Sequence, residues 1–257
     1  MAKWISNVLF VPINLYLSLF ANEDHSFSKA QEDVKRAFYW VYPYPQIVSY
    51  LRDEGKKSIL IFSYGSLMDS SSAARSLSKI SMATRRPGIA FGIRRLFDRD
   101  VPICKGSKWG IPNDPNARGM LNIMLSEQPE DFINGVLVDV ILEDIPDILC
   151  REEEYDLLPI VVQNWDNIAN SEHPHYLIAY TFHAPQGSGA TNSTILPRPG
   201  YYELTRNASL LYGQIFYQIW LNTTYFADGI TPITEWEKEI LQGKERTKFT
   251  YDSLDIP

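Results

Sequence analysis

The stretch Ser58-Ile-Leu-Ile-Phe-Ser-Tyr-Gly-Ser-Leu-Met68 is the most informative part of this chain. Its first half is apolar and β-branched, which predicts a short buried strand over Ile59–Phe62. The strand breaks into Tyr64-Gly65-Ser66-Leu67, where the glycine permits a positive φ or a close approach of a ligand to the backbone. Such a turn leaves several backbone N–H groups pointing into one space, which suits an oxyanion or a carboxylate.

The densest acidic cluster, Arg151-Glu152-Glu153-Glu154-Tyr155, is the second informative stretch. It closes a predicted helix over Ile145–Glu154, with Asp144 as its cap and Pro146 at its first position. Adjacent glutamates on a helix point in different directions, so at most one is expected to face a pocket, where burial would raise its pKa. An anion-holding turn and a separate proton-transferring carboxylate are the minimum parts for acyl transfer without a cofactor.

Composition limits the class of protein. The chain has 257 residues, 45% of them hydrophobic and 21% charged, as in ordinary globular domains. Its net charge of −7 argues against nucleic acid as a partner. Cys104 and Cys150 are too few for a disulfide framework or a zinc site. We expect two reduced, mostly buried thiols, which favours the cytoplasm.

The first 21 residues complicate the prediction of compartment. Lys3 precedes an apolar stretch, Trp4 to Ala21, that contains Pro12 and several polar residues. A membrane-spanning helix needs about 20 predominantly apolar residues, and this stretch is too interrupted. A cleaved signal peptide, and therefore secretion, is the alternative to the cytoplasm, and contact with a membrane surface is a further reading.

Three regions are predicted along the chain: an N-terminal helical extension (1–57), a main domain (58–233), and a C-terminal helix and tail (234–257). The extension is expected to hold a helix that starts at Ser26 or Ser28 and a second over Gln46–Arg52.

The main domain is predicted to mix strands and short helices without regular alternation, which indicates an α+β fold. Its remaining expected strands are Ile89–Phe97, Met120–Leu125, Val136–Ile141, Ile160–Val162 and Tyr176–Phe182. An Asn134-Gly135 turn is expected before the third of these. Further helices are expected over Ser70–Lys79, Tyr202–Trp220 and Thr234–Gln242.

Four motifs, in this order, resemble the γ-glutamylcyclotransferase family, including its ChaC-like and AIG2-like branches. They are Tyr64-Gly65-Ser66-Leu67, Gly92-Ile93-Arg94-Arg95-Leu96-Phe97, Asn134-Gly135-Val136-Leu137, and Ile148-Leu149-Cys150-Arg151-Glu152 followed by Tyr155. The resemblance covers roughly residues 58–185. It implies a mixed β-sheet or small barrel flanked by helices.

The resemblance also implies a reaction, in which the α-amine of a γ-glutamyl group attacks its own γ-carbonyl and releases 5-oxoproline and an amine. This chemistry needs neither a metal nor a cofactor. The turn at Tyr64-Gly65-Ser66-Leu67 would bind the glutamyl group, and Glu152, matched to the Arg-Glu pair of the family, would be the general acid and base. Many ChaC-like members carry glycines where Glu153 and Glu154 stand, so Glu153 stays open as an alternative.

Arg94 and Arg95 are expected either to contact a substrate carboxylate or to form structural salt bridges. Tyr155 is expected to pack beneath the helix, whereas the sequence assigns no role to Tyr201 or Tyr202.

Three rival interpretations remain. A hydrolase that uses Ser66 lacks the Gly-x-Ser-x-Gly pattern. A metal site would have to use Glu172, His173, His175 and His183, although histidines in a proline-containing loop are usually solvated. A non-catalytic module on the same fold would bind a small ligand or a partner. The sequence defines neither the leaving group (glutathione, a γ-glutamyl amino acid or a γ-glutamyl amine) nor the oligomeric state.

Overall fold

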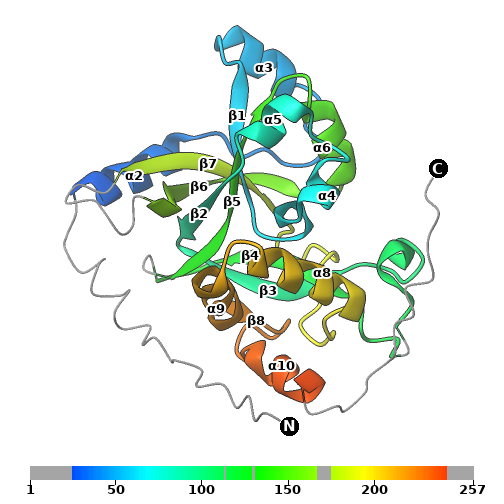
Figure 1. Cartoon of the computed structure of the whole chain (residues 1–257). Coiled ribbons are helices and arrows are strands. Elements are labelled where there is room, and N and C mark those ends of the chain that lie inside the picture. Colours follow the sequence, from blue (N-terminus) through cyan, green and yellow to red (C-terminus); the bar gives the residue numbers. More distant parts are fainter. Residues whose placement is uncertain (1–24, 113, 129–130, 167–174, 242–257) are drawn as a thin grey trace.

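The computed structural model describes residues 25–112, 114–128, 131–166 and 175–241 (Figure 1). The apolar segment at the N-terminus, together with Glu172 and His173 of the predicted metal site, therefore lies outside the described residues.

The centre of the molecule is a closed five-stranded barrel (Figure 1). Its strand order is β1-β5-β2-β6-β7. The strands are β1 (Ser58–Ser63), β5 (Phe132–Ile141), β2 (Arg86–Phe91), β6 (Asp156–Asn164) and β7 (Tyr176–His183). All pairings are antiparallel except that of β1 with β7, which closes the barrel. The predicted α+β class, with a small barrel flanked by helices, is confirmed.

A second sheet, β4-β3-β8, lies against the barrel (Figure 1). It is formed by β4 (Gly119–Leu125), β3 (Ile93–Asp100) and β8 (Thr224–Tyr225). The prediction of one bent strand over Ile89–Phe97 is wrong, because Gly92 has a φ of 70° and separates β2 from β3. The chain passes there from one sheet into the other.

The Asn134-Gly135 pair also differs from its prediction, because both residues lie inside β5. A Cβ at Gly135 would stand 2.5 Å from the Phe62 ring and from the Ser63 carbonyl oxygen. Asn134 donates to the Phe216 carbonyl at 2.6 Å. The dipeptide therefore serves close packing within the barrel, and no turn forms.

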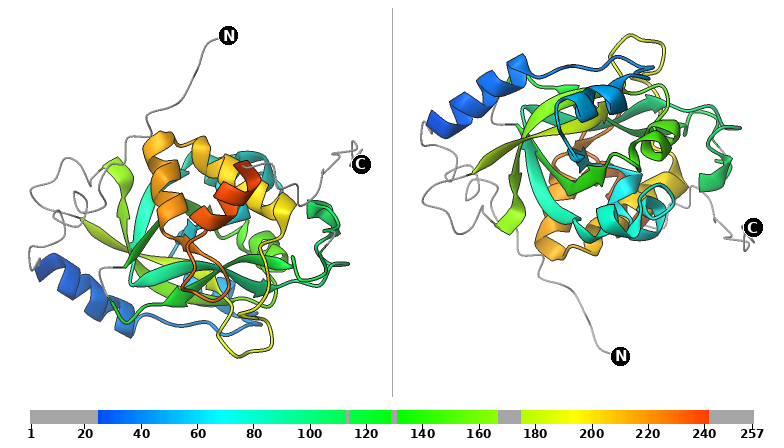
Figure 2. Two further views of the ribbon diagram at one scale, coloured as in Figure 1. Left: turned by 90° about the horizontal axis from the view of Figure 1, so that it is seen from below. Right: turned by 90° about the horizontal axis from the view of Figure 1, so that it is seen from above.

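Two groups of helices flank the sheets, one beside the barrel and one beside the second sheet (Figures 1 and 2). One group contains α3 (Ile47–Asp53), α4 (Ser70–Ala73), α5 (Lys79–Ala83) and α6 (Ile145–Arg151). The other contains α8 (Pro199–Leu210), α9 (Gln214–Asn222) and α10 (Thr234–Leu241). The helix predicted over Tyr202–Trp220 is α8 and α9, which are separated at Gly213, where φ is 98°. The helix predicted over Ser70–Lys79 is likewise replaced by α4 and α5.

Asp144 precedes α6 but makes no capping hydrogen bond. Its carboxylate instead accepts hydrogen bonds from the Ser78 N–H at 2.9 Å and the Ser81 hydroxyl at 2.5 Å. This carboxylate therefore holds α5 against the start of α6.

The N-terminal helix α2 (His25–Arg36) packs along β6 and β7 at one edge of the barrel (Figure 2). The chain after it pairs with β6 through reciprocal hydrogen bonds between Trp40 and Leu157, at 3.1 and 2.9 Å. Residues 38–44 are thus built onto the barrel wall next to the start of β6.

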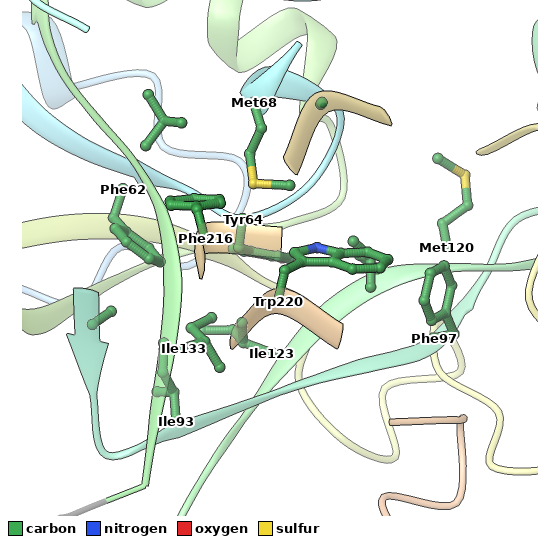
Figure 3. Close-up of a cluster of buried hydrophobic side chains, with 14 of the residues drawn as sticks. Phe62, Tyr64, Met68, Ile93, Phe97, Met120, Ile123, Ile133, Phe216 and Trp220 are labelled. Carbon is green, nitrogen blue, oxygen red and sulfur yellow. The ribbon is translucent and has the colours of Figure 1, made fainter. Parts of the chain in front are cut away.

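A buried hydrophobic cluster joins the barrel to the second sheet (Figure 3). Phe62 comes from β1, Met68 from the 3-10 turn η1 (Ser66–Met68), and Tyr64 from the short link between them. They meet Phe97 of β3, Met120 and Ile123 of β4, and Phe216 and Trp220 of α9. The turn after β1 therefore packs against this buried hydrophobic cluster.

Two further observations concern the compartment. No helix in the described ranges is long and apolar enough to cross a membrane. Cys104 and Cys150 are free, as expected, but both are exposed, so the prediction that they are mostly buried is wrong.

Candidate active site

A cavity of about 210 Å³ opens beside the turn that follows β1. It is lined by the four residues of that turn, by the loop after β3, by β4, by the end of α6 and by Tyr201 of α8. The turn and Glu152, which are far apart in the sequence, line the same cavity. The two elements that sequence analysis singled out are thus brought together by the fold.

The turn offers its backbone to the cavity. The side chain of Leu67 is buried in a hydrophobic cluster with Ile61 and Ala73, and the Tyr64 hydroxyl donates to the Phe182 carbonyl at 2.6 Å. Within the described residues, the N–H groups of Gly65 and Leu67 have no acceptor in the protein. These two N–H groups are therefore available to an anionic or carbonyl oxygen of a ligand.

Gly65 has a φ of −123°, so the positive φ that its identity allowed does not occur. Glycine is required here because there is no room for a side chain. A Cβ at this position would stand 2.6 Å from the Tyr201 hydroxyl oxygen. The ring of Tyr201 is held edge-on to Trp109, with the ring centres 5.2 Å apart.

Tyr201 is a site residue that sequence reasoning missed, since nothing in its local sequence connects it with the turn. Burial raises the pKa of its hydroxyl, and the negative charge of Glu152 adds to this rise, while hydrogen bonding to Ser66 opposes it. The Tyr201 hydroxyl is therefore protonated at neutral pH and lies beside the turn.

The helix α6 ends at Arg151 and not at Glu154 as predicted, and Glu152 is its C-cap residue, whose N–H donates to the Ile148 carbonyl at 3.0 Å. Its side chain is 17% exposed. Burial raises the pKa of this carboxyl, and the neighbouring Arg151 guanidinium opposes the rise. Arg151 Nε lies 3.1 Å from Glu152 Oε1, so the carboxyl is oriented as well as partly stabilised in its charged form.

Arg151 also connects Glu152 to the turn. Its Nη2 donates to the Ser66 hydroxyl at 2.9 Å and to the Ser72 hydroxyl at 2.7 Å, and its Nη1 contacts the Ser72 carbonyl. One planar guanidinium thus links the end of α6, the turn after β1 and α4. This fixes the position of Glu152 relative to the turn.

Glu153 and Glu154 also line the cavity, so the expectation that at most one of the three glutamates would face a pocket is wrong, but both of these side chains are exposed. Glu154, with a φ of 68°, forms ion pairs with Arg99 at 2.8 Å and Lys105 at 3.1 Å, and these partners lower its pKa. Glu153 is exposed at the cavity edge. Burial thus raises the pKa of Glu152, whereas the ion pairs of Glu154 lower the pKa of that carboxyl.

Tyr155 lines the cavity next to these glutamates. Its hydroxyl donates to the Leu121 carbonyl at 3.4 Å, and Arg99 lies over its ring at 5.0 Å. It therefore packs between α6 and β4, as expected of a residue beneath the helix.

Neither Arg94 nor Arg95 lines the cavity. Arg94 forms an ion pair with Asp131 at 2.7 Å. Arg95 is fully buried, donates to Asn134 at 2.9 Å, and lies 5.5 Å from the centre of the Trp220 ring. Burial lowers the pKa of Arg95 to about 9. Both arginines make structural contacts.

The rival sites gain no support from the described residues. None of the cavity-lining residues is a histidine that could activate Ser66. No group of three or more His, Cys, Asp or Glu side chains suited to a metal ion occurs among the residues that the structure describes.

Comparison with known proteins gives structural matches only, since neither a family model nor a curated protein sequence matches the chain. One similar solved structure is described as a gamma-glutamyl cyclotransferase, with 12% identity, a TM-score of 0.45, and coverage of 77% of this chain and 95% of that one. An uncharacterized protein from Homo sapiens has 13% identity and a TM-score of 0.45, with coverage of 78% and 95%. YkqA from Bacillus subtilis has 14% identity and a TM-score of 0.46, with coverage of 65% and 54%.

At identities of 12–14% and TM-scores of 0.45–0.46, these likenesses carry no information about activity or substrate.

Proposed function

We propose that this chain is an enzyme of the γ-glutamylcyclotransferase type. The proposal rests on two contacts of Arg151. This arginine forms an ion pair with Glu152, whose pKa is raised, and donates a hydrogen bond to Ser66 in the turn. The N–H groups of Gly65 and Leu67, free of protein acceptors within the described ranges, belong to the same turn and the same cavity. An acid–base group and main-chain donors therefore share one small space.

In the proposed reaction, a bond forms between the α-nitrogen and the γ-carbon of the glutamyl group. The bond between the γ-carbon and the leaving nitrogen breaks. Glu152 accepts a proton from the attacking nitrogen and gives it to the leaving nitrogen, so that 5-oxoproline and an amine are released. The turn N–H groups stabilise the oxyanion between the two steps.

The known magnitudes of these effects fit a small site without cofactors. Intramolecular attack in a well-oriented substrate supplies up to about 7–11 kcal/mol. Proton transfer by a positioned carboxyl contributes about 10²–10⁴-fold. Because burial raises the pKa of Glu152, this carboxylate is a stronger base than a solvated one.

The test is production of 5-oxoproline from glutathione, γ-glutamyl amino acids and γ-glutamyl-ε-lysine. Glu152→Gln should fold normally and lose turnover by about 10²-fold or more. Asp147→Asn, on the exposed face of α6, is the matched control and should keep full turnover.

Two results would contradict the proposal. If Glu153→Gln abolished turnover and Glu152→Gln did not, the acid–base role would move to Glu153. If the folded wild-type protein released no 5-oxoproline from any compound, the alternative of a non-catalytic binding module would be favoured. The free thiols of Cys104 and Cys150 suit a reducing compartment, so the cytoplasm remains the proposed location.

A further inference from the structure

The two ends of the cavity differ in burial. Phe62, Tyr64 and Tyr201 form a buried end beside the turn. Lys105 and Lys108, on the loop that follows β3, are exposed and form the mouth. A glutamyl group held by the turn would therefore direct its leaving group toward the two lysines.

Four cations line the cavity, and three of them already have acidic partners. Arg151 pairs with Glu152, whereas Arg99 and Lys105 share Glu154. Lys108 is the fourth, and it forms no ion pair with any residue that the structure describes.

The charges around Lys108 favour an incoming anion. Desolvation by the neighbouring groups lowers the pKa of its ammonium group, and the positive charges of Arg151 and Arg75 lower it further, while Glu152 opposes them. A ligand carboxylate beside Lys108 would relieve this repulsion and would return the pKa toward its ordinary value.

The loop that carries Lys108 is firmly held. Lys108 Nζ lies 4.2 Å from the centre of the Trp109 ring. Arg198, fully buried before α8, donates from Nη2 to the Gly110 carbonyl at 2.6 Å and to the Ile103 carbonyl at 3.3 Å. Trp109 in turn packs on Tyr201. The loop therefore holds the Lys108 ammonium group in a fixed position relative to the turn.

We propose that Lys108 binds a carboxylate of the leaving group, so that the preferred substrates are γ-glutamyl amino acids or peptides and not γ-glutamyl amines. This inference rests on the function proposed above. Lys108 then determines specificity, while the turn and Glu152 supply the chemistry.

The test compares γ-glutamylalanine with γ-glutamylalaninamide, which differ only in the charge of the leaving group. The wild-type protein should prefer γ-glutamylalanine by roughly tenfold in kcat/KM. Lys108→Met should remove this preference, and Lys108→Arg should keep most of it. Lys79→Met, an exposed lysine of α5 outside the cavity, is the control and should leave both values unchanged.

The ratio of the two substrates is the decisive quantity, because any effect of Lys108 on the acid–base group cancels in it. An absence of preference in the wild-type protein would overturn the inference. An equal loss for both substrates in Lys108→Met would also overturn it, since Lys108 would then act on the glutamyl end or on the loop.

A binding experiment separates this inference from the proposed function. Calorimetry with the Glu152→Gln protein measures the affinity for the same two compounds without turnover. A preference for γ-glutamylalanine that Lys108→Met abolishes would support the carboxylate subsite even if the wild-type protein released no 5-oxoproline. Equal affinities for the two compounds would refute the subsite, and binding of neither would refute both proposals.

Discussion

The hydroxyl oxygen of Tyr201 lies 2.6 Å from the point that a Cβ atom at Gly65 would occupy. No real side chain tolerates such a contact, so an alanine at this position must displace the Tyr201 ring or the turn. Both residues line the proposed active site, and the ring is buried. A substitution at Gly65 that displaces the Tyr201 ring is therefore expected to alter the proposed active site as well as the packing.

We expect Gly65→Ala to destabilise the protein by about 1–3 kcal/mol, the usual cost of overpacking, and to reduce turnover. Tyr201→Phe removes the atom that collides. The double variant should therefore be more stable than the sum of the two single changes predicts, as measured by urea denaturation. Simple additivity would mean that the two residues do not compete for this space.

Glu152 and Arg151 predict a pH dependence of activity. Because burial raises the pKa of Glu152, its protonated, inactive form persists above the ordinary value of 4.5. The kcat/KM should rise with pH through this raised pKa. Arg151→Met removes the main cause that lowers the pKa, so the rise should move to higher pH. An unchanged or acid-shifted profile would contradict this.

The raised pKa of Glu152 also predicts that the stability of the protein depends on pH. The folded state binds the Glu152 proton more tightly than the unfolded state does, so folding is favoured by protonation. The free energy of unfolding should therefore fall as pH rises from about 4.5 through the raised pKa. Urea denaturation across this window should show less of this fall in Glu152→Gln. If the two proteins show the same dependence, the pKa of Glu152 is not raised by folding.

The hydrogen bonds of Asp156 attach residues 38–44 to the barrel. Its buried carboxylate accepts a hydrogen bond from the Tyr42 N–H at 2.9 Å and one from the Tyr39 hydroxyl. Asp156→Ala should cost about 2–4 kcal/mol, since hydrogen bonds to charged groups contribute about 1.5–3 kcal/mol each.

Tyr39→Phe, which removes one of these bonds, is the graded control for Asp156 and should cost less. Hydrogen exchange should then show faster exchange at Trp40, whose N–H is bonded to Leu157 of β6. If Asp156→Ala were as stable as the wild type, residues 38–44 would contribute little to the fold. The predicted boundary after residue 57 would then separate an independent extension.

Gly106 provides a test of the loop that carries Lys108. A Cβ there would stand 2.0 Å from Arg198 Nη1, so Gly106→Ala must push the loop away from its anchor. We expect a smaller ratio of kcat/KM for γ-glutamylalanine over γ-glutamylalaninamide, with the overall fold retained by circular dichroism. An unchanged ratio would show that the position of the loop does not control the preference.

Local sequence predicted most of the elements, and its errors have a common cause. Ile59–Phe62 and Met120–Leu125 were recognised because an apolar, β-branched run is a local property. The predictions for Gly92 and for Asn134-Gly135 are wrong because glycine has several structural uses. It can form a turn, let the chain pass from one sheet to another, or permit close packing. Which of these occurs depends on residues that are remote in the sequence. Tyr201 was missed for the same reason, since its partner in the turn is remote in the sequence.

The sequence by itself determined the α+β class, the turn after β1 and the acidic cluster at the end of α6, because each depends on residues that are neighbours in the chain. Only the tertiary structure decided which of the three cavity-lining glutamates is the least exposed and which of the two cavity-lining lysines forms no ion pair with a described residue. Burial and ion pairing depend on residues from separate elements, here Arg151 with Ser66, and Glu154 with Arg99 and Lys105. Identical side chains thus acquire different pKa values once the fold places them among different charges.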